Sequence, residues 1–79
     1  MRVVKEINND KCKITVFSWN GKYLIKLEQG DLEQTYKVDE MDLISENDID
    51  EILNGQFVDE AMKLFRSMNN ILTDATKEL

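Results

Sequence analysis

Apolar and polar residues alternate through the first half of the chain. Residues 13–19 and 22–28 both alternate in this way, and they flank an Asn20-Gly21 pair. Asn-Gly supplies the two positive-φ residues of a type I′ hairpin turn. That turn fixes a register in which Trp19 faces Lys22 and Phe17 faces Leu24. Because side chains alternate across a sheet, one core face collects Ile14, Val16, Tyr23, Ile25 and Leu27.

Two further turn signals extend this hairpin into a sheet. A two-residue loop at Gly30-Asp31 places Tyr36 beside Ile25 on the core face. The same register sets two like charges, Glu33 and Glu28, opposite each other. Residues 2–7 are compatible with a strand, and residues 8–10 (Asn-Asn-Asp) are typical of a turn. We therefore expect three or four antiparallel strands.

The periodicity becomes helical after the last strand. Ser45 followed by Asp48 resembles a capping box. An apolar stripe at helical spacing follows and ends at Asn54-Gly55, a natural stop. A second helix is expected over about residues 56–68. The two stripes are Ile49, Ile52 and Leu53, then Phe57, Ala61, Leu64, Phe65 and Met68.

Strands first and helices afterwards predict an α+β fold. The expected order is β-β-β-β-α-α, an antiparallel meander with the C-terminal helices packed on one face. Residues 1–70 form one domain, and residues 71–79 form a tail, either frayed or a short helical extension.

The composition narrows the function classes. The chain has 79 residues, one cysteine and no histidine. These counts exclude an internal disulfide and a Cys/His metal cluster, and we expect no metal and no other cofactor. A chain this short has a thin core, which favours oligomerisation as a source of stability. No apolar segment is long enough for a signal core or a membrane span, so we expect a cytoplasmic protein with no membrane partner.

Charge is distributed unevenly along the chain. Residues 1–38 carry seven Lys/Arg against five acids, a balance of +2, and residues 39–79 carry three against eleven, a balance of −8. The net charge of −6 disfavours binding to a polyanion.

Signals of catalysis are absent from the sequence. No nucleophile has a histidine base, and no glycine-rich loop is present to hold phosphate. The acidic runs 39–42 and 48–51 do not follow the spacing of a calcium-binding loop and suit helix starts instead. We therefore expect a protein without enzymatic activity and without catalytic residues.

The second face of the sheet is the candidate interaction surface. It combines aromatic and basic side chains that rarely go unused when exposed. A second copy, a different protein or single-stranded nucleic acid are all candidate occupants. Alternatively, Ile71-Leu72 of the tail or the N-terminal strand covers this face. We expect a homodimer. The candidate residues are Lys13, Thr15, Phe17, Trp19, Lys22, Leu24, Lys26 and Lys37.

The element order and this face chemistry resemble one known architecture. Four strands followed by a helix, with a Lys/aromatic sheet, resemble the PC4 and Whirly single-stranded DNA-binding transcriptional regulators. The resemblance spans residues 2–68 and implies a dimer that binds single-stranded DNA through the sheet. The acidic net charge and the break at Asn54-Gly55 depart from that pattern.

Overall fold

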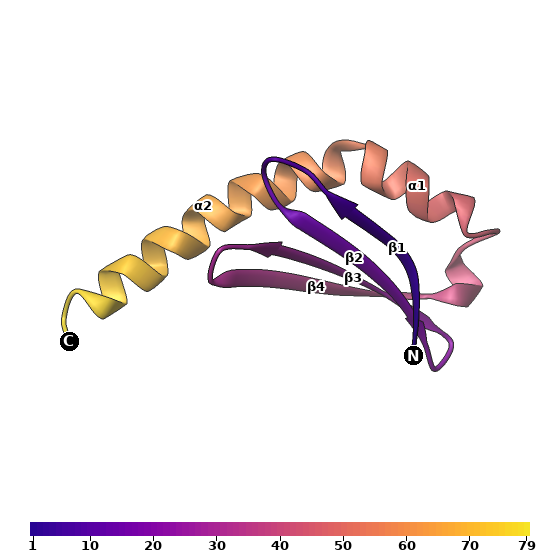
Figure 1. Ribbon diagram of the computed structural model, residues 1–79, viewed down its shortest axis with the longest axis horizontal. Coiled ribbons are helices and arrows are strands. Elements are labelled where there is room, and N and C mark those ends of the chain that lie inside the picture. The colour runs from indigo at the N-terminus through magenta and orange to yellow at the C-terminus, as the bar shows by residue number, and fades with distance from the viewer.

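The computed structural model describes residues 1–79 and has the predicted α+β architecture. Four antiparallel strands form one sheet in the order β1-β2-β3-β4, and the helices lie together on one face of it (Figure 1). No helix is both long and apolar enough to cross a membrane. The elements are β1 (Arg2–Asn8), β2 (Lys13–Trp19), β3 (Lys22–Gln29), β4 (Leu32–Asp39), a 3-10 turn η1 (Glu40–Asp42), α1 (Asn47–Asn54) and α2 (Gln56–Thr76).

The central hairpin has the register that the turn chemistry predicts. Phe17 pairs with Leu24, and Trp19 pairs with Lys22. Asn20 and Gly21 have φ values of 58° and 76°, the positive pair that a type I′ turn needs.

The β3–β4 hairpin also has its predicted register. Tyr36 pairs with Ile25, and Glu33 lies opposite Glu28. Gly30 has a φ of 58°, whereas Asp31 does not have a positive φ. A glycine at the first central position alone is typical of a type II′ turn, the other turn that suits the twist of a two-residue hairpin.

The N-terminal segment is the fourth strand and pairs with β2. The register between β1 and β2 shifts at Val4, where β1 has a bulge. The loop after β1 is closed by Asn9, whose Oδ1 accepts hydrogen bonds of 2.8 Å from the backbone N–H groups of Lys11 and Cys12. This is an Asx-type turn, the local use of asparagine that the sequence suggests.

The core lies between the sheet and the helices. Phe65 of α2 is the largest fully buried side chain. Gln34, a buried polar residue of β4, donates from Nε2 to the carbonyl oxygen of Ala61 at 2.9 Å. Tyr36 of β4 meets Phe57 of α2 edge to face, with ring centroids 4.9 Å apart. The buried core is Cys12, Ile14, Val16, Tyr23, Ile25, Leu27, Ile49, Leu53, Ala61 and Phe65.

The start of α1 differs from the predicted capping box. Ser45 makes no side-chain hydrogen bond to the helix N-terminus. The Asp48 carboxylate instead accepts a 2.8 Å hydrogen bond from the N–H of Ile44, one residue before Ser45. In a capping box, the Asp48 carboxylate would accept from the N–H of Ser45, and the Ser45 hydroxyl would accept from the N–H of Asp48. The Asp48 carboxylate instead binds the N–H one residue earlier, and neither capping-box bond forms.

Gly55 separates two helices that follow each other almost directly. α1 ends at Asn54, as predicted, and α2 begins at Gln56. A side chain at Gly55 would bring its Cβ to 3.3 Å from the Glu51 carbonyl oxygen, which is a tight contact.

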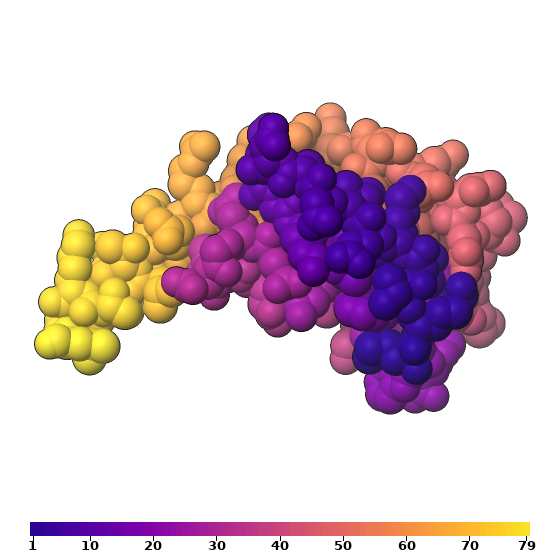
Figure 2. All heavy atoms as spheres, in the orientation of Figure 1, coloured from indigo at the N-terminus to yellow at the C-terminus, as the bar shows by residue number.

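α2 continues beyond the expected end at Met68 to Thr76. Its 21 residues make a helix about 31 Å long, and the C-terminal part projects past the sheet (Figures 1 and 2). The molecule is therefore elongated, with extents of 46 × 24 × 20 Å.

Candidate interaction face

The side chains that point away from the helices form what we call the open face. All eight residues predicted for the candidate surface lie on this side, because their positions alternate along each strand with those of the core residues. One of them, Thr15, is only 7% exposed because its neighbours on the same face cover it. β1 adds residues that the sequence analysis did not place. The open face consists of Val3, Glu6 and Asn8 from β1, Lys13, Thr15, Phe17 and Trp19 from β2, Lys22, Leu24, Lys26 and Glu28 from β3, and Glu33, Thr35, Lys37 and Asp39 from β4.

An apolar row crosses three strands of the open face. Val3, Phe17 and Leu24 occupy neighbouring positions, because Phe17 pairs with Val3 on one side and with Leu24 on the other. Trp19 follows on β2 at the hairpin end. Val3 is 55% exposed and Trp19 is 52% exposed, while Phe17 and Leu24 are partly buried. The chain itself therefore covers this apolar row only in part.

Charges on the open face are paired and balanced. Lys13 Nζ lies 3.3 Å from Glu6 Oε1, and Lys22 Nζ lies 3.1 Å from Asp39 Oδ1. Lys26 lies between two carboxylates, at 3.6 Å from Glu33 and 3.9 Å from Glu28. Only Lys37 among the four lysines has no ion pair within 4.0 Å. Four lysines and four acids make the open face neutral overall, a fact that the sequence analysis missed because it did not assign the acids to this side.

Neither end of the chain covers the open face, so the alternative in which the tail or the N-terminal strand covers it does not hold. β1 extends the sheet at its edge, beside β2. The tail residues Ile71 and Leu72 belong to α2, which lies on the opposite face and continues past the β3–β4 turn (Figure 1). The open face is therefore free in the monomer.

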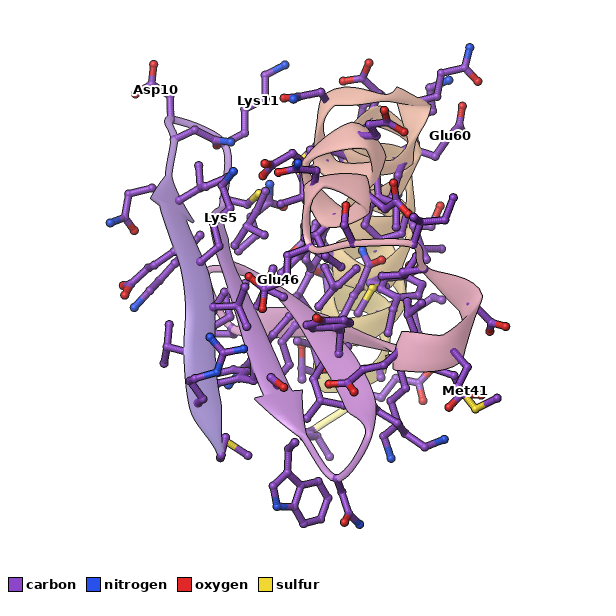
Figure 3. The ribbon with its side chains drawn as sticks, turned by 90° about the vertical axis from the view of Figure 1, so that its right-hand side faces the viewer. Lys5, Asp10, Lys11, Met41, Glu46 and Glu60 are labelled. Atoms are coloured by element: carbon purple, nitrogen blue, oxygen red, sulfur yellow. The ribbon has the colours of Figure 1, made fainter.

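Two ion pairs connect β1 to the start of α1 on the helix side. Arg2 donates to Glu46 Oε1 at 2.8 Å, and Lys5 pairs with Asp50. In Figure 3, Lys5 and Glu46 both lie between β1 and the helices, whereas Met41 points outward. The hydrogen bond and charge of Glu46 raise the pKa of Arg2. Burial, followed by the charge of Glu46, raises the pKa of the Tyr23 phenol.

The reactive groups that the sequence suggests are used structurally. Cys12 lies in the core and is 6% exposed, and burial raises the pKa of its thiol. A thiol with a raised pKa stays protonated near neutral pH and is a poor nucleophile. The carboxylates of the acidic runs serve as partners of Lys5, Lys22 and a backbone N–H. No group of three or more Cys, Asp or Glu side chains is placed to hold a metal ion.

A second apolar surface lies at the projecting part of α2. Here a groove of about 520 Å³ runs between the β3–β4 turn and the helix. Leu32 and the α2 residues Met68, Ile71, Leu72 and Ala75 line it, and Asp31 and Glu33 flank it. This groove could not be predicted, because the sequence leaves open whether residues 71–79 are frayed or form a short helical extension. Ile71 is 69% exposed and Leu72 is 43% exposed, so the groove remains shallow and open.

Comparison with known protein families, curated proteins and solved structures finds no match to this chain.

Proposed function

We propose that the protein is a small non-enzymatic interaction module that forms a homodimer through the open face. The observation that carries this proposal is the partly exposed apolar row of Val3, Phe17 and Leu24, with Trp19 beside it. Contiguous exposed apolar surface on a small domain is typical of a protein contact. Tryptophan is also among the residues most enriched at energetically important interface positions.

The balance of charge on the open face favours a second copy over a polyanion. A two-fold interface brings the same surface against itself, so a strongly basic face would repel its own copy. The pairing of Lys13, Lys22 and Lys26 with carboxylates removes that repulsion. It also removes the excess positive charge that single-stranded nucleic acid requires.

The hairpin register identifies a suitable two-fold axis. An axis parallel to the strands and midway between β2 and β3 places each β2 residue over the β3 residue with which it already pairs. Phe17 then lies over the partner's Leu24, and Lys13 lies over the partner's Glu28. An in-plane axis perpendicular to the strands and passing through the Phe17–Leu24 row would also match apolar with apolar, but it would set Lys22 over the partner's Lys26, a contact between like charges. The first arrangement matches apolar with apolar and positive with negative.

The area of the open face determines how much of it the proposed dimer must bury. Four strands of seven or eight residues cover about 19 by 25 Å. A stable interface commonly buries about 800 Å² of accessible surface on each partner. The flat area of the open face, about 475 Å², is below that figure, so the whole face is needed, including the charged rows at both ends. Sheet faces pack about 10 Å apart in such contacts.

Sedimentation over a range of protein concentrations tests the proposed dimer. We expect a concentration-dependent dimer for the natural chain and a monomer for Trp19→Ala, with blue-shifted Trp19 emission when the dimer forms. Met41→Ala is the matched control, because Met41 is 97% exposed and lies in η1, off the open face. A monomer at all concentrations would overturn the proposal. Quenching of Trp19 by single-stranded oligonucleotides, weakening steeply with salt, would replace it with nucleic-acid binding.

A charge-swap experiment tests the axis itself. Lys13→Glu and Glu28→Lys each create two like-charge contacts in the proposed dimer, and we expect each variant to self-associate about ten-fold more weakly. Mixing the two variants restores opposite charges at both contacts, so a heterodimer forms preferentially. If a substitution weakened association by unfolding its own chain, mixing the two variants would not restore association. Failure of the mixture to associate better than either variant alone would exclude this axis.

A further inference from the structure

A polar hollow lies where the β1–β2 loop and the end of β3 meet α2, on the helix side of the sheet and away from the open face. Its volume is about 490 Å³, and the buried ring of Phe65 forms part of its floor. Lys11 of the loop and Arg66 of α2 both line it, together with the amide side chains of Gln29 and Asn69. Cationic side chains and amide N–H groups are the donors that bind oxyanions in proteins.

The two cations of this hollow have no partner within the chain. Seven of the ten lysine and arginine side chains form ion pairs within 4.0 Å. Lys11, Lys37 and Arg66 are the three that do not, and two of these three line the same hollow. In a chain with 16 acids, a pair of unneutralised cations in one concave site is the arrangement that an external anion would complete.

We propose that this hollow binds the oxyanion group of a small ligand, a phosphate or a carboxylate, between Lys11 and Arg66. The guanidinium of Arg66 presents a planar set of donors that matches either group in a bidentate manner. The ammonium of Lys11 adds a second positive charge, and the amide of Asn69 offers a neutral donor at the same site. The Gln29 amide is already used within the chain, because its Nε2 donates to the Lys11 carbonyl oxygen and to Met62 Sδ.

The elements that carry the two cations are held in place before any ligand binds. The backbone N–H of Lys11 donates to Asn9 Oδ1 at 2.8 Å, and its carbonyl oxygen accepts from Gln29 Nε2 at 3.0 Å. Arg66 follows the fully buried Phe65 within the continuous helix α2. Binding therefore does not have to order the backbone on either side of the hollow, which reduces its entropic cost.

Asp10 carries a negative charge at the same site, so its removal should change anion binding in the opposite direction to removal of Lys11 or Arg66. Asp10 also lines the hollow, yet its carboxylate forms no ion pair within 4.0 Å with either cation. Figure 3 shows the side chains of Asp10 and Lys11 leaving the loop in different directions. An anion in the hollow would be repelled by Asp10, so Asp10→Asn should tighten binding about two-fold.

Titration of the isotope-labelled protein with inorganic phosphate, followed by NMR at constant ionic strength, tests the site. Succinate in a parallel titration separates a carboxylate ligand from a phosphate ligand. We expect saturable shifts of the amides around Lys11 and Arg66, with a dissociation constant on the order of 1 mM. Lys11→Gln and Arg66→Gln should each weaken binding about ten-fold. Both residues are exposed, so neither change removes core packing.

Lys37→Gln is the matched control, because it removes the same charge from the third unpaired cation, which lies on the open face. Unchanged binding in this variant, together with tighter binding in Asp10→Asn, would support the proposal. Equal weakening in all three charge-removing variants would show a diffuse charge effect and would overturn it. The absence of saturation by both anions below about 10 mM would overturn it as well.

Discussion

The adjacent residues Leu64 and Phe65 provide a sharp test of how α2 docks on the sheet. Both belong to the apolar stripe of the helix, but Phe65 is fully buried and Leu64 is 48% exposed. Replacement of each by alanine, one at a time, keeps the helix propensity high and removes a large apolar side chain in both cases. We expect Phe65→Ala to destabilise the protein strongly and Leu64→Ala to have little effect.

The expected difference follows from burial. Truncation of a buried phenylalanine to alanine costs about 3–5 kcal/mol, from lost transfer free energy and from the cavity left behind. A domain of 79 residues has a total free energy of unfolding of roughly 4–12 kcal/mol. Phe65→Ala thus removes between a quarter and all of the stability, whereas a surface substitution such as Leu64→Ala changes it by about 0.5 kcal/mol. In thermal unfolding, the loss at Phe65 corresponds to a decrease of at least about 12 °C.

Urea unfolding followed by far-ultraviolet circular dichroism measures both variants at one fixed protein concentration, because self-association adds to apparent stability. The midpoint should fall for Phe65→Ala with little change in the slope against denaturant, since the surface exposed on unfolding is nearly the same. Equal losses for the two variants would refute the packing of α2 described above. A larger loss for Leu64→Ala would mean that the helix is rotated about its axis.

Three further predictions concern the turn, a tyrosine and the cysteine. Gly21→Ala should cost about 1 kcal/mol in thermal unfolding, because φ is 76° there while a Cβ would meet no neighbouring atom. The pKa of Tyr23 in the folded protein is raised above the unfolded value of about 10. The stability that Tyr23 contributes is therefore complete below about pH 10 and is lost as the pH rises through the folded pKa. Tyr23→Phe should lose less stability than the natural chain over that pH range, and equal losses would contradict this. Cys12 should react with a disulfide reagent at neutral pH only when the domain opens, so the rate should rise with urea; a fast reaction in the native protein would disagree with its burial.

Local turn chemistry explains why so much of the sheet was predictable. Asn20-Gly21 and Gly30-Asp31 are two-residue turns, and a two-residue turn fixes every pair along its hairpin. The partner of β1 was not predictable, because its loop is longer and its register shifts at Val4. The neutrality of the open face depends on that edge strand and on β4, which contribute Glu6, Glu33 and Asp39. Strand pairing across the whole sheet is needed to find it.

The helices show where local rules are insufficient. Asn69-Asn70 is a weak helix-forming pair that suggests an end, but α2 passes through it. Continuing an existing helix adds a hydrogen bond for each residue fixed, so a modest propensity penalty does not end it. Met68 and Leu32 both pack against the core, and Leu72 lines a groove together with them, an arrangement that no local pattern reveals. The cation pair Lys11 and Arg66 was equally hidden, since 55 positions separate the two residues in the sequence and only the fold brings them to one hollow.

The strand order β1-β2-β3-β4 also has a consequence for how quickly the chain reaches its native state. Every strand pairs with its neighbour in the sequence, so each hairpin closes over a loop of a few residues at low entropic cost. Chains rich in such short-range contacts fold rapidly for their size. Among the side-chain hydrogen bonds and ion pairs, those that span the most sequence are Arg2 with Glu46 and Lys5 with Asp50, solvent-accessible pairs of modest strength. We therefore expect the four-stranded sheet to form first and the helices to pack on it afterwards. Substitutions in the central hairpin should then slow folding more than substitutions at these ion pairs.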